Sequence, residues 1–81
     1  MPVTVRFFAA ARQAAGAPEA ACAPGTLESL GRELVERFPE LDLVLPRCSY
    51  LVNGVAAHGD LDAVTIQDAD EVDVLPPFAG G

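Results

Sequence analysis

One amphipathic helix near the middle of the chain constrains the fold more than any other feature. Its apolar residues recur at spacings of three and four, which is typical of one helical face: Leu27, Leu30, Leu34 and Phe38. Thr26 offers a side-chain hydroxyl to cap the first turn, and Pro39 ends the helix. In a chain of 81 residues, this apolar face of the helix must be buried against a second layer of secondary structure. We therefore expect the helix to pack on one face of a small mixed sheet.

The strands of that sheet are predicted from short alternating or apolar segments. Residues 3–7 and 71–74 alternate apolar with polar side chains, as expected of strands with one face in the core. Residues 48–52 form another strand, and Asn53-Gly54 favours a type I′ hairpin turn to a short strand at 55–57.

The other segments give weaker signals. Residues 9–15 form a short helical turn that ends at Gly16, and residues 19–23 are a weak second strand. Residues 61–67 are expected to be a plain connection. If the first and last strands pair in parallel, the crossover through the helix is right-handed.

Composition excludes several classes of function. Twelve acidic residues against five arginines give a net charge of −7, which repels nucleic acid. This charge serves solubility, or steering towards a basic partner, or both. No apolar run reaches the roughly 18 residues of a membrane span, and the N-terminus lacks the features of a signal peptide, so we expect a cytoplasmic protein. Cys22, Cys48 and the single His58 do not have the spacing of a metal site, and we interpret both cysteines as small buried residues.

The segment that bears on function is Leu75-Pro76-Pro77-Phe78-Ala79 followed by Gly80-Gly81. Two glycines give a backbone thin enough to enter a narrow channel. The prolines favour an extended geometry and cannot donate ladder hydrogen bonds, so the tail is expected to leave the sheet with little entropy to lose on docking. We therefore divide the chain into a domain at residues 1–76 and a flexible tail at residues 77–81.

On these features the chain resembles the ubiquitin-like β-grasp sulfur carriers, most closely the family of molybdopterin synthase small subunits. The resemblance covers the whole chain. It rests on residues 5–9, the start of the helix at Thr26-Leu27 and Leu30, and three further motifs: Leu51-Val52-Asn53-Gly54, Asp70-Glu71-Val72 and Pro76-Pro77-Phe78-Ala79-Gly80-Gly81. It implies an α+β fold with a mixed sheet of four to five strands covered on one face by one main helix. In that strand order Cys22 and Cys48 lie too far apart for a disulfide.

The resemblance also implies a mechanism. An adenylating enzyme of the ubiquitin-activating type uses ATP to activate the Gly81 carboxylate, and a sulfur donor converts it to a thiocarboxylate. The large subunit of molybdopterin synthase then receives the tail, and the sulfur attacks cyclic pyranopterin monophosphate on the way to molybdenum cofactor. The chain itself binds no cofactor and supplies no general base, so catalytic groups are expected on the large subunit, in a hetero-oligomer.

The expected partner-binding residues surround that tail. They are Gly80, Ala79, Phe78, Pro77, Pro76, Leu75 and Phe8. Phe8 is either an apolar anchor on the exposed sheet face or a packing residue. Three other functions remain open: a sulfur carrier for thiamine or cysteine biosynthesis, a ubiquitin-like protein modifier, and a plain interaction domain. The scattered carboxylates form no plausible pocket for an enzyme that acts alone.

Overall fold

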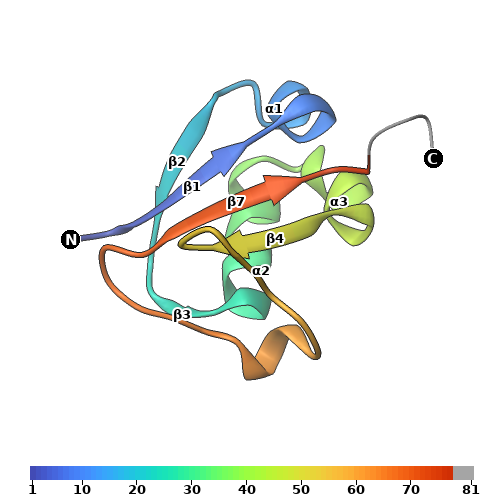
Figure 1. Ribbon diagram of the computed structural model, residues 1–81. Coiled ribbons are helices and arrows are strands. Elements are labelled where there is room, and N and C mark those ends of the chain that lie inside the picture. Colours follow the sequence, from blue (N-terminus) through green and yellow to red (C-terminus); the bar gives the residue numbers. More distant parts are fainter. Residues whose placement is uncertain (78–81) are drawn as a thin grey trace.

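A mixed sheet of five strands organises the molecule, and the computed structural model describes residues 1–77. Its order is β2-β1-β7-β4-β5. The strands are β1 (Val3–Phe7), β2 (Glu19–Cys22), β4 (Ser49–Val52), β5 (Val55–Ala56) and β7 (Glu71–Leu75). β1 and β7 run parallel in the middle of the sheet, and the other neighbouring strands are antiparallel (Figure 1). The parallel pairing of the first and last strands, on which the expected right-handed crossover was conditional, is present.

The helices lie mainly on one face of this sheet (Figure 1). They are α1 (Ala9–Ala15), α2 (Leu27–Arg37), α3 (Leu41–Val44) and the 3-10 helices η1 (Leu45–Arg47) and η2 (Leu61–Ala63). α2 is the longest and covers the sheet, as predicted for an α+β fold with one main helix. We call the face of the sheet that α2 does not cover the open face. Within residues 1–77, no helix is both long and apolar enough to cross a membrane.

Local sequence explains the limits of α2. The backbone N–H of Ser29 donates to the Thr26 hydroxyl at 3.1 Å, and the N–H of Thr26 donates to the Ser29 hydroxyl at 2.9 Å. This reciprocal pair satisfies N–H groups that have no partner within the helix. At the other end, Phe38 has non-helical dihedral angles directly before Pro39. The predicted cap and stop are both confirmed.

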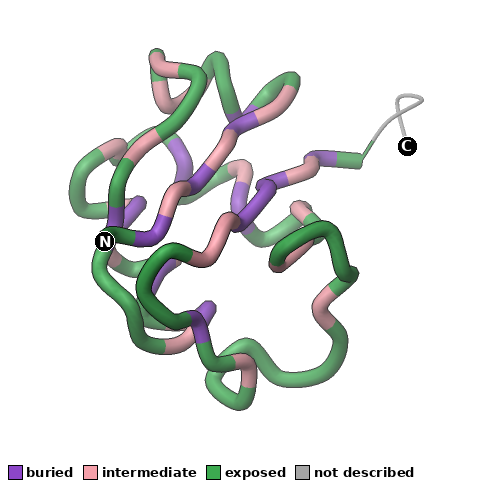
Figure 2. Tube along the Cα trace, turned by 60° about the vertical axis from the view of Figure 1, so that its left-hand side comes forward, coloured by how far each residue is buried: buried purple, intermediate pink, exposed green. Residues whose placement is uncertain are grey.

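The core fills the space between α2 and the inner face of the sheet. Residues with at most 1% exposure come from both layers: Val3, Val5, Val72 and Val74 from the central strands, Leu27, Leu30 and Leu34 from α2, and Ala11, Leu41 and Ile66 from other segments. Phe7 packs edge-to-face on Phe38, with ring centroids 5.8 Å apart. In Figure 2, buried and partly buried positions alternate along the longer strands, and most positions of the connecting loops are exposed.

Two parts of the fold differ from the sequence-based expectation. Residues 61–67 are more than a connection, because β6 (Thr65–Ile66) pairs antiparallel with β3 (Gly25–Thr26) in a second, two-stranded sheet. The pairing carries Ile66 into the core at 1% exposure. Residues 41–47, to which no element was assigned, form α3 and η1 and bury Leu41 and Leu45.

The predicted hairpin turn is present. Asn53 and Gly54 both have positive φ, 50° and 82°, and connect β4 to β5 through a two-residue loop. The Asn53 side chain also ties this turn to the start of β7: its oxygen accepts from the Glu71 N–H at 2.9 Å and its nitrogen donates to the Asp70 carboxylate at 3.0 Å.

The cysteines are separated by the central strands. Cys22 ends β2 and Cys48 precedes β4, so β1 and β7 lie between them, and both thiols are free. The prediction that they form no disulfide is confirmed. Cys22 is 3% exposed, and burial raises the pKa of its thiol to about 11. Cys48 is only partly buried, although burial also raises its pKa.

Candidate functional site

The candidate site lies on the open face at the end of β7. Phe7 and Val74 are partners in the parallel register of β1 and β7, and both point into the core. Because side chains alternate along a strand, the next residues, Phe8 and Leu75, point to the open face. The Phe8 N–H donates to the Val74 carbonyl at 3.3 Å, which holds the two strand ends together. Both side chains are half-buried.

The sheet ends directly after this apolar pair. Leu75 is the last β7 residue with a ladder partner, Ser49 on β4. Pro76 is buried and Pro77 is exposed. Neither proline has an N–H to donate to a neighbouring strand, so the chain leaves the sheet at this point.

An ion-pair network lies on the open face beside Phe8. Arg6 donates from Nε to Asp73 Oδ1 at 2.8 Å and from Nη2 to Asp73 Oδ2 at 3.1 Å. The same guanidinium lies 3.3 Å from the Glu71 carboxylate. Its carbon also lies 5.7 Å from the centroid of the Phe8 ring, within the range of a cation–π contact. The network therefore fixes the Arg6 side chain over the face of Phe8.

The electrostatics of this network favour binding over acid–base chemistry. Asp73 is 7% exposed although it lies on the open face, because Arg6 covers it from β1 and Leu51 is its register partner on β4. The hydrogen bonds that Arg6 donates to the Asp73 carboxylate raise the pKa of Arg6 above its already high ordinary value, so Arg6 remains charged. The groups that meet here can orient a partner chain, and a permanently charged guanidinium cannot shuttle protons.

The structure brings some of the predicted site residues together. Phe8, Leu75, Pro76 and Pro77 lie at the same end of the sheet, and of these Phe8 and Leu75 belong to the open face. Phe78, Ala79, Gly80 and Gly81 lie outside the described residues, and so does nearly all of the predicted tail at 77–81. His58 is exposed in a loop, as expected.

Arg6 and Asp73 were not predicted as site residues. Each occupies an outward position in its strand and their charges are opposite, which is a usable signal once the strands are known to be neighbours. The signal becomes specific only with the register, which pairs Arg6 with Asp73 across 67 residues of sequence.

The strand order, the parallel central pair and the single main helix on one face define a ubiquitin-like β-grasp protein. The model of the ThiS family matches residues 5–81, and the chain belongs to this family. The resemblance inferred from sequence is thus confirmed.

Individual relatives agree with this assignment. The molybdopterin synthase sulfur carrier subunit of Chlamydomonas reinhardtii is 31% identical over 84 residues, and the match covers 100% of both chains. The small archaeal modifier protein 1 of Methanosarcina acetivorans is 28% identical with a TM-score of 0.86, covering 98% of this chain and 95% of that chain. A complex of subunits 1 and 2 of the molybdopterin-converting factor from Helicobacter pylori 26695 contains a chain that is 26% identical, with a TM-score of 0.72 and 100% coverage of both chains.

Proposed function

We propose that this chain is the sulfur carrier subunit of a molybdopterin synthase. The observation that carries the proposal is the end-to-end match to a protein of that name in Chlamydomonas reinhardtii. Membership of the ThiS family and the fold of residues 1–77 are consistent with it.

The proposed chemistry takes place at the carboxyl group of Gly81. A carboxylate is a poor electrophile, so an adenylating enzyme of the ubiquitin-activating type first joins it to AMP at the expense of ATP. A sulfur donor displaces AMP and leaves a thiocarboxylate, which then gives its sulfur to cyclic pyranopterin monophosphate. This chain binds no cofactor in the proposal, and the catalytic groups belong to the large subunit.

The open face supplies the binding energy in this proposal. Phe8 and Leu75 are the apolar anchors, and the Arg6–Asp73 pair orients Phe8 for contact. Pro76 and Pro77 direct the tail away from the sheet towards the large subunit. The complex of subunits 1 and 2 in Helicobacter pylori supports a hetero-oligomer of this kind.

A second candidate is a ubiquitin-like protein modifier, joined through Gly81 to lysines of target proteins. The similarity to a small archaeal modifier protein favours it specifically. It predicts isopeptide-linked adducts in cell extracts, whereas a carrier gives a free thiocarboxylate.

The proposal is tested by the intact mass of the protein after incubation with ATP, a sulfur source and an adenylating enzyme of the ubiquitin-activating type. We expect the mass increase of one oxygen atom replaced by sulfur, followed by transfer to cyclic pyranopterin monophosphate when the large subunit is added. One residue appended after Gly81 should abolish loading, and the same residue placed before Met1 is the control. Loading without transfer to the pterin would assign the carrier to another pathway, and no loading would refute a carrier role.

A further inference from the structure

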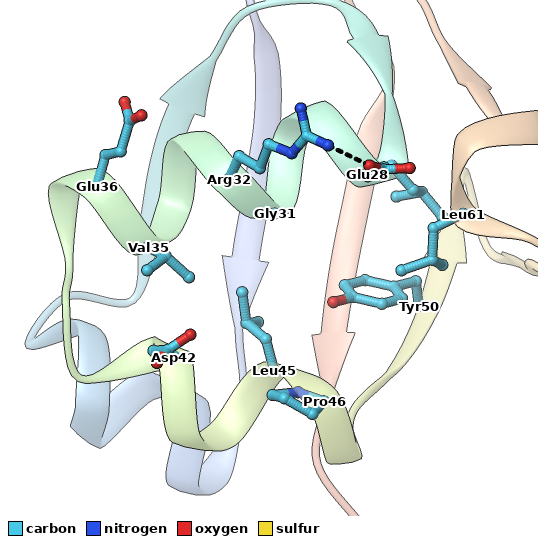
Figure 3. A pocket seen from close by; sticks show the side chains of 11 residues that line it. Glu28, Gly31, Arg32, Val35, Glu36, Asp42, Leu45, Pro46, Tyr50 and Leu61 are labelled. Carbon is cyan, nitrogen blue, oxygen red and sulfur yellow. Dashed lines mark hydrogen bonds and ion pairs between the residues drawn. The ribbon is translucent and has the colours of Figure 1, made fainter.

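A groove lies on the helix-covered side of the molecule, between α2 and the α3–η1 segment. Its volume is about 480 Å³. The residues that form its apolar wall are Leu27, Gly31, Val35, Leu45, Tyr50 and Leu61. Figure 3 shows the side chains of Val35, Leu45, Tyr50 and Leu61 directed towards a common space. Residues of α2, η1, β4 and η2 therefore form the apolar wall of this groove. The groove lies on the side of the sheet opposite to Phe8 and Leu75.

Tyr50 gives the groove one polar group at its floor. The residue comes from β4 and is 8% exposed, with its hydroxyl pointing into the hollow (Figure 3). An aromatic ring with a hydroxyl tip offers both contact area and a hydrogen bond, a combination that is enriched at protein interfaces.

Gly31 keeps the groove open at a cost to the helix. It occupies the middle of α2, where glycine is less favourable than alanine by about 1 kcal/mol. A Cβ placed on Gly31 would meet no atom within 4 Å, and its φ is not in the left-handed region. Neither packing nor backbone geometry within the described residues therefore requires glycine here. A larger side chain would occupy the space that the groove leaves free.

The charges around the groove select its occupant. Glu36 on α2 and Asp42 on α3 both line one end of the groove and are exposed. In Figure 3 the Asp42 side chain lies on the α3 side of the groove, and the Glu36 side chain points outward from α2. Arg32 also lines the groove but is paired with Glu28. The rim is therefore acidic, and with a net charge of −7 a second copy of this chain would be repelled. A basic partner is favoured.

We propose that this groove docks a protein partner through a short helical segment, with an aliphatic side chain in the groove and a lysine or arginine at the acidic end that Glu36 and Asp42 form. The groove is open along one side, which suits a helix laid into it better than a small ligand that must be mostly enclosed. Because it lies opposite the open face, this partner and one bound to Phe8 and Leu75 can be present together. The proposal does not depend on the function proposed above.

The test is an NMR titration of the ¹⁵N-labelled full chain with a synthetic amphipathic helical peptide made of leucine and lysine. We expect amide shifts concentrated at Gly31, Val35, Leu45 and Tyr50. Gly31→Leu should fill the groove and weaken binding by about tenfold or more, while Gly31→Ala, which adds one methyl group, should stay within about twofold. Glu36→Gln with Asp42→Asn should weaken binding by about fivefold.

Controls separate docking from general attraction between opposite charges. Glu19→Gln with Asp68→Asn removes the same number of carboxylates from exposed positions away from the groove, and should leave the affinity unchanged. A peptide with glutamate in place of lysine should not bind. Shifts spread over the whole surface, or equal binding by Gly31→Leu and the unmodified chain, would overturn the proposal. The spectrum of each variant shows directly whether it folds.

Discussion

Phe7 and Phe8 are adjacent in sequence and opposite in role. Phe7 is 3% exposed and packs on Phe38 in the core, whereas Phe8 is half-buried on the open face beneath the Arg6 guanidinium. The end of β1 and the residue that follows it thus serve folding on one face and, in the proposed function, docking on the other. Both residues are phenylalanine, so the difference in their surroundings and roles results from the face of the sheet on which each side chain lies.

The contrast extends across the central strands. The inner face of β7 carries Val72 and Val74, both fully buried, and its open face carries Glu71, Asp73 and Leu75. The open face is not a generic solvated surface, because Asp73 is 7% exposed and is held by two hydrogen bonds from Arg6. A face that is polar, ordered and partly covered is suited to recognition.

The largest expected effect is on the inner face. Phe7→Ala should lower the free energy of unfolding by about 3–5 kcal/mol, because it leaves a cavity against Phe38. Urea denaturation followed by circular dichroism measures this loss. A loss below about 1 kcal/mol would show that the core tolerates the cavity. It would contradict the difference in role between Phe7 and Phe8.

Phe8→Ala should act on binding instead. We expect a loss of about 2 kcal/mol in affinity for the large subunit, roughly a thirtyfold rise in Kd, as for an interface anchor. Isothermal titration calorimetry gives the affinity, and urea denaturation of the same variant is the control, with a change of about 1 kcal/mol or less. Unchanged affinity would assign Phe8 to packing alone.

A smaller effect is expected from the ion pair. Arg6→Ala should lower the midpoint of urea denaturation more than Arg32→Ala does, since it leaves the nearly buried Asp73 carboxylate without its charged partner. Arg32→Ala is the matched control, because its pair with Glu28 lies on an exposed helix face and is worth about 0.3–0.5 kcal/mol. Equal losses in the two variants would show that Asp73 is effectively solvated.

The smallest effect concerns the turn before β7. A hydrogen bond from the Gln67 N–H, and a second from Asn53, lower the pKa of Asp70. Its contribution to stability is therefore fully present above the unfolded-state pKa of about 4 and is lost as the pH falls through the lower folded-state pKa. Urea midpoints should consequently fall less steeply below about pH 4 in Asp70→Asn than in the unmodified chain. Asp68→Asn, at an exposed position, controls for removal of a charge. Identical pH profiles for the unmodified chain, Asp70→Asn and Asp68→Asn would contradict the stabilising role of the Asp70 carboxylate.

Sequence reasoning was most successful where the pattern is local. The leucine stripe of α2, the alternation in β1 and β7, and the Asn53-Gly54 turn each follow from neighbouring residues, and all were confirmed. Phe8 and Leu75 were expected to bind a partner; the structure places both half-buried at the same end of the sheet, and their role in binding stays a prediction. The order of the strands came from resemblance to a family, because pairing between distant segments has no local signal.

The missed features depend on tertiary contacts. β3 and β6 have two residues each, which is too short for a recognisable alternation, and they exist because they pair with one another. α3 has four residues between Pro39 and Pro46, too few for a helical period. The Arg6–Asp73 pair needs the register of two strands at opposite ends of the sequence. The groove beside Gly31 needs α3 in place, so an isolated helical pattern could not reveal it.

The central position of β7 also bears on how the protein is made. A nascent chain translated only as far as β5 holds two strand pairs, β2–β1 and β4–β5, with nothing between them to join their hydrogen-bond ladders. Only the arrival of residues 71–75 from the ribosome can close that gap, so the five-stranded sheet cannot assemble before these residues have been made. Enzymes that recognise the assembled sheet would thereby ignore truncated translation products.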